Sequence, residues 1–248
     1  MKTAVVTGAS SGIGAASARA LAADGWRVIC GARRVERVEK LAAELGNDAV
    51  GLGLDVTDQA SVEGLASYVD GIGQLDLLVN NAGGAKGTTT IAAADPAEWE
   101  WMFATNVLGT VRVTKALLPK LLAASAGSVI NIVSIAGHYP YVGGGGYNAA
   151  KFGERALTNV LRQELAGTPV RVCEIDPGLV QTEFSLVRFG GDAAAAAAVY
   201  DGVEPLTAAD VAEAVRWVAS QPAHVNIDNL TIAARDQIGP NKVRRADR

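Results

Sequence analysis

Tyr147 and Lys151 are the residues best suited to proton transfer, because their i, i+4 spacing places both side chains on one face of a helix. A free tyrosine has a pKa of about 10, which is too high for a proton acceptor at neutral pH. A neighbouring ammonium stabilises the phenolate, and a shift of about 3 pKa units corresponds to roughly 4 kcal/mol. The pair can therefore exchange a proton with the oxygen of a carbonyl compound or an alcohol.

A glycine-rich turn near the start of the chain is the second chemical feature. Thr7 ends a β-like run and a helical run follows the turn, in which Gly8 permits the tight bend. Gly12 lets the backbone approach a pyrophosphate, and Gly14 lets the helix pack close to the strand. The free N–H groups at the helix start attract phosphates. The candidate ligands of a dinucleotide are Gly8, Ser10, Ser11, Gly12, Ile13 and Gly14.

The end of the second β-like run indicates which dinucleotide binds. An enzyme specific for NAD places an acidic side chain there to bind the ribose hydroxyls, whereas this chain has Ala32. Arg33, with help from Arg34, can form charge-assisted hydrogen bonds to a 2′-phosphate. The alternative is that both arginines merely open a solvated helix. We predict NADP(H) as the cofactor.

The elements that must position these residues alternate between strands and helices. Short β-branched runs predict strands at residues 4–7, 27–30, 50–54, 75–80, 127–134, 170–176 and 229–233. Alanine- and leucine-rich runs predict helices at 13–24, 35–45, 59–69, 97–122, 147–165 and 208–220, with a short helix at 193–198. This alternation implies right-handed crossovers and a parallel sheet. Strands that are apolar almost throughout indicate helices on both faces of the sheet. Helix starts are predicted at Asp58, at Asp95-Pro96 and at Thr207 with Asp210.

Composition excludes several classes of protein. The 248 residues are 49% hydrophobic and carry a formal net charge of −4, which excludes a disordered chain and argues against nucleic-acid binding. Cys30 and Cys173 lie in apolar runs and are expected to be buried free thiols. Neither a membrane span nor a signal peptide is found, so we expect a cytoplasmic protein. Length alone allows one domain or two.

Several motifs recur in a fixed order along the chain. The turn has the spacing G-x-x-x-G-x-G, and it is followed by Asp55-Val56, Asn80-Asn81-Ala82-Gly83, Asn106, Ser134, Tyr147-x-x-x-Lys151 and Pro177-Gly178. With these motifs the chain resembles the short-chain dehydrogenase/reductase family over its whole length. The resemblance implies a single domain over residues 1–248. It also implies a Rossmann fold, with a doubly wound, seven-stranded parallel sheet between helices, and leaves no room for a second substrate domain.

The resemblance also implies roles for individual residues. Ser134 would donate a hydrogen bond to the substrate oxygen, beside Tyr147 and Lys151. Asn106 resembles the family asparagine that holds a water and connects the lysine to solvent. Asn80 would brace its strand. The remaining cofactor contacts would be Asp55 and Val56 at the adenine, Asn81 along the cofactor, and Pro177, Gly178, Val180 and Thr182 at the nicotinamide amide.

One subgroup resembles this chain closely, through residues 138–141, 176–180, 182–189 and 217–227. It is the bacterial NADP-dependent serine 3-dehydrogenase, or 3-hydroxy acid dehydrogenase, group. The resemblance implies a small 3-hydroxy acid or related anionic compound as substrate. An anion needs a cationic partner, for which Arg188 and then Lys86 are the candidates, and His138 is a further candidate substrate contact. His138 and His224 lack metal-ligand spacing, so no metal is expected.

Some stretches depart from this subgroup. Four consecutive glycines, Gly143–Gly146, are expected to loosen the loop before the tyrosine helix, and Lys86 lies where relatives have an apolar pocket wall. A bulkier aldehyde or ketone is therefore an alternative substrate. A dinucleotide-binding sensor is an alternative class, although such proteins would lose Tyr147 or Lys151. A sugar-nucleotide epimerase or dehydratase would need a G-x-x-G-x-x-G turn and a longer C-terminal domain.

The helices at 105–122 and 147–165 carry more apolar surface than one sheet face needs. By resemblance they would pair across a homodimer that doubles to a homotetramer. The apolar residues in question are Val107, Leu108, Val111, Phe152, Ala156, Leu157, Val160 and Leu161.

Overall fold

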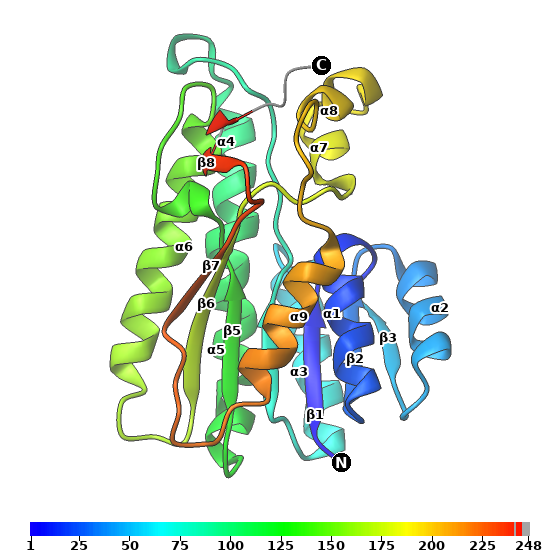
Figure 1. The fold of residues 1–248 in the computed structure, drawn as a ribbon. Coiled ribbons are helices and arrows are strands. Elements are labelled where there is room, and N and C mark those ends of the chain that lie inside the picture. The colour runs from blue at the N-terminus through cyan, green and yellow to red at the C-terminus, as the bar shows by residue number, and fades with distance from the viewer. Residues whose placement is uncertain (241, 245–248) are drawn as a thin grey trace.

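A computed structural model describes residues 1–240 and 242–244, and one parallel sheet forms its centre (Figure 1). The seven strands lie in the order β3-β2-β1-β4-β5-β6-β7. Their bounds are β1 (Thr3–Thr7), β2 (Arg27–Ala32), β3 (Val50–Gly53), β4 (Leu77–Asn80), β5 (Ser128–Ile132), β6 (Arg171–Pro177) and β7 (Asn229–Ile232). The predicted seven-stranded parallel sheet is confirmed, with strand ends that differ by a few residues.

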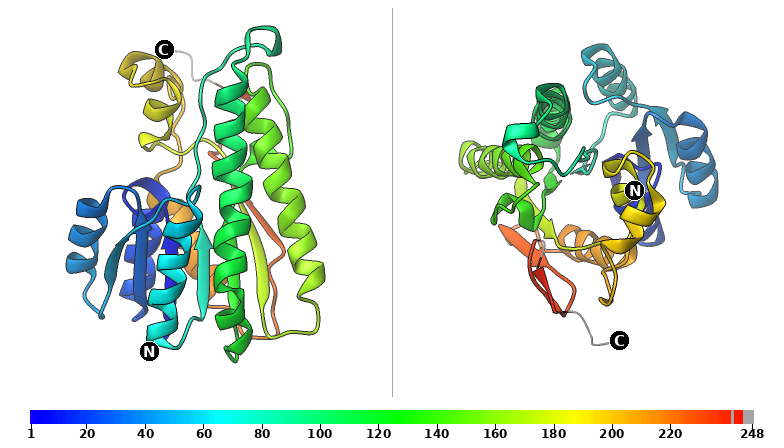
Figure 2. Two further views of the ribbon diagram at one scale, coloured as in Figure 1. Left: turned by 180° about the vertical axis from the view of Figure 1, so that it is seen from behind. Right: turned by 90° about the horizontal axis from the view of Figure 1, so that it is seen from above.

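Helices cover both faces of the sheet, as Figure 2 shows from behind and from above. One face carries α1 (Gly12–Ala23), α2 (Val35–Leu45) and α9 (Ala208–Ala219), and the other carries α3 (Gln59–Ile72), α5 (Gly109–Ala123) and α6 (Gly145–Glu164). Successive residues of a strand point to opposite faces of the sheet and so pack in different hydrophobic cores. In β1, for example, Val6 packs in the core under α1 and Val5 in the core under α3. Burial on both faces accounts for the apolar strands of the sequence.

The helices begin where short polar side chains can satisfy free backbone N–H groups. Asp58 accepts hydrogen bonds from the N–H groups of Ala60 and Ser61, and Asp95 accepts one from Ala97. Thr207 and Asp210 bond each other's backbone in a capping box at the start of α9. These predicted helix starts are confirmed, and so is the short helix α8 (Ala193–Ala198).

The predicted helix at 97–122 is wrong as one continuous helix. It is divided into α4 (Pro96–Phe103), a π-helical turn η2 (Ala104–Leu108) and α5. The sequence pattern did not reveal this wide turn, which alters the helical register around Asn106. Further short elements are the 3₁₀ turns η1 (Ile91–Ala93) and η3 (Ile135–Gly137), the helix α7 (Glu183–Arg188), and the antiparallel pair β8 (Gln237–Gly239) and β9 (Lys242–Val243).

The two halves of the sheet run outward from β1 and β4, so the chain reverses its direction of winding between these strands. Open α/β sheets bind ligands outside the carboxyl ends of their strands at such a switch point. Figures 1 and 2 show α7 and α8, in yellow, above this edge and over the blue start of the chain. The topology thus places the glycine turn, the ends of β4 and β5, and α7 around one space.

Candidate active site

A cavity of about 920 Å³ lies at this edge of the sheet. This volume is near the upper end of the range for pockets that hold small molecules and cofactors. Its walls come from the glycine turn, the ends of β2 to β6, the start of α6, and α7. The cavity is lined by all of the predicted catalytic and cofactor residues except Gly14 and Asn106, which lie behind its wall.

The glycine turn has the close packing that its sequence predicts. Gly8 and Gly12 have φ angles of +67° and +53°, which glycine adopts without strain. A Cβ atom at Gly14 would lie 2.5 Å from the carbonyl oxygen of Gly8, so no larger residue fits there. Asn81 donates a hydrogen bond to the Thr7 carbonyl (2.9 Å) and ties β4 to the turn. The turn is therefore held rigidly at the rim of the cavity.

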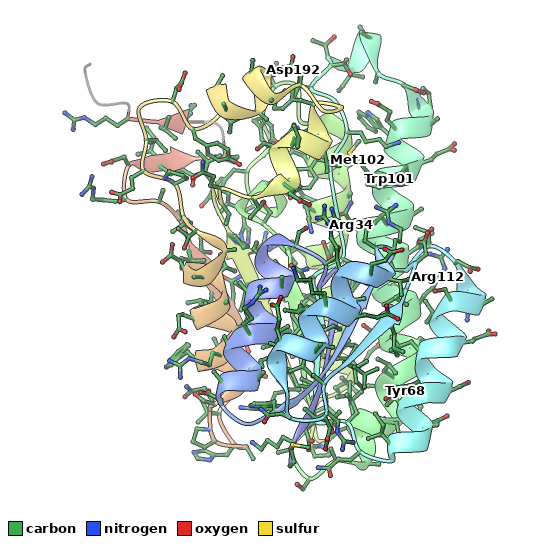
Figure 3. The ribbon with its side chains drawn as sticks, turned by 90° about the vertical axis from the view of Figure 1, so that its right-hand side faces the viewer. Arg34, Tyr68, Trp101, Met102, Arg112 and Asp192 are labelled. Carbon is green, nitrogen blue, oxygen red and sulfur yellow. The ribbon has the colours of Figure 1, made fainter. Side chains whose placement is uncertain are left out.

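Arg34 lies directly over this turn and forms several charged contacts. Its guanidinium donates to the hydroxyls of Ser10 (3.0 Å) and Ser11 (2.8 Å) and to the Glu183 carboxylate on α7 (2.8 Å). Figure 3 shows Arg34 between the blue N-terminal ribbons and the yellow α7. Hydrogen bonds from Arg37 and Arg34 lower the pKa of Glu183 to about 2. The two arginines thus already hold an anionic group here.

Arg33 lines the cavity on the other side of this cluster, toward Asp55. The sequence favoured Arg33 over Arg34 as the main phosphate ligand, but the structure brings Arg34 to the serine hydroxyls of the turn. Burial opposes ionisation of Asp55, but hydrogen bonds from Thr57 and the charge of Arg33 outweigh it and lower the Asp55 pKa. Asp55 and Val56 lie side by side in the cavity wall.

Tyr147 lies on the first turns of α6, is only 8% exposed, and forms part of the cavity wall. The Phe184 ring packs against it with ring centres 5.5 Å apart. Burial raises the pKa of Tyr147 above its usual value, while Lys151 and a hydrogen bond with Ser134 oppose this rise. Lys151 lowers the pKa of Tyr147, as predicted, but burial raises this pKa by more. Tyr147 is therefore a phenol at neutral pH.

Lys151 is also buried, with its Nζ 5.9 Å from the centre of the Tyr147 ring. It donates to the Ile132 carbonyl (3.1 Å) and to the Glu154 carboxylate (2.6 Å). Burial alone would lower the pKa of Lys151, but the charges of Glu154, Tyr147 and Asp176 and the hydrogen bond to Glu154 together raise it. The sequence did not reveal Glu154, because an acidic residue on a helix is usually solvated.

Asn106 is fully buried in η2, where its side chain binds the loop that follows β4. Its amide group donates to the carbonyls of Gly84 (2.9 Å) and Met102 (2.6 Å), and its Oδ1 accepts from the Gly84 N–H (3.1 Å). A Cβ atom at Gly83 would lie 2.5 Å from Asn106 Oδ1 and 3.7 Å from Lys151 Nζ. Asn106 therefore fixes the backbone that faces the lysine.

The three candidate substrate contacts lie in different surroundings. Arg188 lines the cavity, donates to the Tyr141 hydroxyl (2.8 Å), and has its guanidinium carbon 5.8 Å from the centre of the Tyr147 ring. Lys86 lies over the Trp101 ring at 4.8 Å and lines a small pocket that Tyr147 and Arg188 also line. His138 lies outside the walls of the large cavity. Of the three, only Arg188 lines the large cavity together with Tyr147.

His138 instead belongs to a buried group behind Ser134. Its Nε2 is 2.7 Å from Asp176 and 3.3 Å from Glu174, and Asp176 also accepts from the Ser134 N–H (3.2 Å). Ligand atoms of the three residues lie within 4.8 Å of one another, as metal ligands can. Asn229, however, donates to both carboxylates, so these groups satisfy each other. The expected absence of a metal stays a prediction.

The glycine run before Tyr147 is packed tightly, and the expectation of a loosened loop is wrong. A Cβ atom at Gly144 would lie 2.5 Å from the Tyr141 ring, and one at Gly145 would lie 2.7 Å from the Trp99 ring. At Gly146 it would lie 2.4 Å from Met102. Figure 3 shows Met102 and Trp101 on α4. The glycines therefore allow bulky side chains to close against the loop.

Comparison with known proteins agrees with this geometry. The family model described as short chain dehydrogenase matches residues 2–188. An uncharacterized oxidoreductase of Mycobacterium tuberculosis is 54% identical over 97% of this chain and 94% of its own. Serine 3-dehydrogenase of Agrobacterium fabrum is 45% identical over 95% and 94%. The closed form of serine dehydrogenase complexed with NADP+ superposes with a TM-score of 0.91, at 41% identity over 98% of this chain and all of that one.

A doubly wound sheet with a phosphate-binding turn and a buried tyrosine–lysine pair defines a dinucleotide-dependent oxidoreductase. The chain belongs to the short-chain dehydrogenase family. The predicted family is confirmed. No helix within residues 1–240 and 242–244 is long and apolar enough to span a bilayer.

Proposed function

We propose that the protein is an NADP(H)-dependent oxidoreductase that interconverts a small aldehyde or ketone and its alcohol. The preferred substrate is a 3-hydroxy acid or a related anionic hydroxy compound. One observation carries this proposal: the Arg188 guanidinium lies in the cavity 5.8 Å from the centre of the Tyr147 ring. A cation at this distance can hold a carboxylate while the tyrosine reaches an oxygen a few bonds away. Serine, named in the relatives, is a 3-hydroxy acid.

The residues around the glycine turn fit a dinucleotide phosphate. The Glu183 carboxylate already occupies the anion position on Arg34, beside the hydroxyls of Ser10 and Ser11. Ala32 offers no carboxylate to repel a 2′-phosphate, and Arg33 lines the same wall. A serine dehydrogenase with NADP+ bound is similar over nearly the whole chain. These observations support NADP(H), which when bound supplies or accepts the hydride.

The protein's own residues then handle the proton. Tyr147, as a phenol, donates its proton to the oxygen of a carbonyl substrate as that oxygen gains charge. Ser134 lies beside Tyr147, and its hydroxyl can turn its single proton toward the same oxygen. Lys151, held by Ile132 and Glu154, keeps a positive charge near the resulting phenolate. In the reverse direction the phenolate accepts the proton of the alcohol.

Three further properties belong to the proposal. We treat residues 1–248 as one NADP-binding domain, because the sheet extends from Thr3 to Ile232. An exposed apolar face on α4 to α6 supports a homodimer or homotetramer. This face comprises Phe103, Leu108, Val111, Phe152 and Val160. A cytoplasmic location agrees with the two buried free thiols, Cys30 and Cys173.

A substrate screen tests the proposed chemistry. NADPH or NADH is supplied with pairs of aldehydes or ketones that differ only in a terminal carboxylate, and the matching alcohols are tested with NADP+ and NAD+. We expect the highest kcat/KM with NADPH and a carboxylate-bearing carbonyl compound. A preference for bulky uncharged ketones would contradict the substrate class. Tight NADPH binding with no turnover of any compound would instead indicate a dinucleotide sensor.

A further inference from the structure

Glu154 is a buried carboxylate, 1% exposed, that lies one helical turn after Lys151 on α6. Its Oε2 accepts a hydrogen bond from Lys151 Nζ at 2.6 Å. Its Oε1 is 3.1 Å from the Thr110 hydroxyl on α5, and that hydroxyl is also 2.9 Å from the Asn106 carbonyl. The carboxylate therefore joins the lysine to the start of α5, next to the turn η2 that carries the buried asparagine.

Burying this carboxylate is costly, because removing an ion from water costs several kcal/mol even after the protein relaxes. Its contacts are polar, so packing alone does not account for it. An apolar residue could fill the position between α5 and α6 without that cost. Unlike an apolar residue, a carboxylate at this position places a negative charge next to the Lys151 ammonium. This charge therefore affects both Lys151 and the neighbouring Tyr147.

We infer that Glu154 is a positioning residue that fixes the Lys151 ammonium beside Tyr147 and offsets the charge of that ammonium at the tyrosine. The inference rests on the proposed function. Glu154 itself touches neither substrate nor cofactor in this arrangement. It acts through the lysine.

The geometry accounts for the positioning. An ammonium has three N–H donors, and Lys151 uses one on the Ile132 carbonyl and one on Glu154. Two fixed acceptors on β5 and α6 determine where the nitrogen lies. The third donor stays available toward the cavity, whose wall includes both Lys151 and Tyr147. Without the carboxylate, the ammonium would be held by a single protein acceptor.

The charges around Tyr147 account for the effect on the tyrosine. The Lys151 ammonium favours the phenolate, whereas Glu154 and the neighbouring Tyr141 disfavour it. Arg188 on α7 has its guanidinium 5.8 Å from the Tyr147 ring centre, and Asp176 on β6 faces both Lys151 and Glu154. Burial, opposed by the ammonium, raises the pKa of Glu154. Burial is the largest cause of the raised Tyr147 pKa, and the Glu154 charge, by offsetting part of the lysine's charge, acts in the same direction.

Glu154→Gln tests this inference with little change in shape. The amide oxygen can accept from Lys151, and the amide nitrogen can donate to Thr110, so the hydrogen bonds persist while the charge is lost. Tyr147 ionisation is followed by NMR of tyrosine labelled with ¹³C at the ζ carbon, and its resonance is identified by its loss in Tyr147→Phe. We expect the Tyr147 pKa to fall in Glu154→Gln, because the charge that offsets the lysine is lost.

Kinetics provides a second readout on the same variant. The midpoint of the pH profile for alcohol oxidation should move to lower pH by a similar amount, because oxidation needs the phenolate. Glu164→Gln is the matched control, since Glu164 is an exposed carboxylate near the end of the same helix. It should shift neither the resonance nor the profile. Glu154→Leu removes the same charge without an amide and should shift both in the same direction.

The outcomes separate this inference from the proposed function. An unchanged or raised Tyr147 pKa in folded Glu154→Gln would overturn the role of Glu154, as would a loss of kcat with no change in the pH profile. A wild-type protein without turnover would refute the proposed function. The NMR titration needs no turnover and would still decide whether Glu154 controls Tyr147.

Discussion

The surroundings of Arg34 differ from what its position in the sequence predicts. The sequence contains two adjacent arginines after Ala32, and the structure brings the second to the serine hydroxyls of the glycine turn. Its partner Glu183 comes from far along the chain, so sequence spacing could not reveal it. The carboxylate that holds Arg34 is replaceable by a phosphate, because both are anions that accept guanidinium hydrogen bonds.

Arg34→Ala should therefore weaken NADPH binding far more than NADH binding. A hydrogen bond to a charged group contributes about 1.5–3 kcal/mol, which corresponds to a roughly 10- to 100-fold increase in the Kd for NADPH. Fluorescence titration with both nucleotides measures the difference. Arg37→Ala, which removes the other partner of Glu183, is the control, and we expect a smaller effect. An equal loss of affinity for NADH and NADPH would show that Arg34 does not bind the 2′-phosphate.

Arg188→Gln should raise KM for a carboxylate-bearing carbonyl compound by roughly 10- to 100-fold, because a charge-assisted hydrogen bond is lost. The KM of the matching uncharged aldehyde should change little. Lys86→Gln removes the second candidate cation, whose amine lies over the Trp101 ring, and should raise the KM for the carboxylate-bearing compound less. If Arg188→Gln raised both KM values equally, Arg188 would be supporting the loop around Tyr141 rather than binding an anion.

At the scale of elements, the carboxyl end of β6 carries a buried pair of acids. Burial and the neighbouring Asp176 raise the pKa of Glu174 to about 8, so Glu174 binds a proton in the folded chain that the unfolded chain releases at a pH near 4.5. A raised pKa stabilises the fold below about pH 4.5, and this stabilisation is lost as the pH rises through about 8. This pair lies directly behind Ser134.

Glu174→Gln should remove this contribution of Glu174 to the pH dependence of stability. The free energy of unfolding of the wild type should decline between about pH 5 and 8, and the variant should decline less, because its amide does not ionise. Urea unfolding across this range measures both slopes. Glu164→Gln, on the exposed part of α6, should keep the wild-type slope. A wild-type stability that rises over this interval would show that Glu174 is ionised in the folded protein.

We propose that cofactor binding depends on the glycine turn. Gly14→Ala should lower stability and abolish NADPH binding, because its Cβ atom would lie 2.5 Å from the Gly8 carbonyl oxygen. Gly64→Ala is the matched control: a Cβ atom at Gly64 in α3 would have no neighbour within 4 Å, and alanine favours helix by about 1 kcal/mol. Thermal unfolding and NADPH titration compare the two. A Gly14→Ala protein that bound NADPH normally would show that close packing of residue 14 on Gly8 is not needed for binding.

Much of this element arrangement could be predicted from the sequence. The parallel sheet followed from alternating strand-like and helix-like runs, and the starts of α3, α4 and α9 followed from Asp58, Asp95 and Thr207. The π-helical turn around Asn106 could not be predicted, because it spans only 5 residues, too few for a change of register to be visible in the apolar pattern. Glu183 was missed because only the folded chain brings it near Arg34, and Glu154 was missed because the sequence does not show that its carboxylate is buried.

At the scale of the whole molecule, an exposed apolar face lies along α4 to α6, opposite the end of the sheet that carries α2. Val160 is 51% exposed at this face. Val160→Asp should shift the protein toward monomers, because an interface core tolerates an unpaired charge poorly. Sedimentation equilibrium measures the shift. Ala43→Asp, on the exposed side of α2, should leave the assembly unchanged; a monomeric wild type would contradict the proposed oligomer.

The central claim is that Tyr147 exchanges the substrate proton in an NADP(H)-dependent reaction. The most direct measurement compares NADPH-dependent reduction of a 3-oxo acid or its semialdehyde by the wild type and by Tyr147→Phe. We expect kcat to fall by about 10²- to 10⁴-fold in the variant, as for loss of a general acid, while its Kd for NADPH stays close to that of the wild type. A variant that retains wild-type turnover with this substrate would contradict the account.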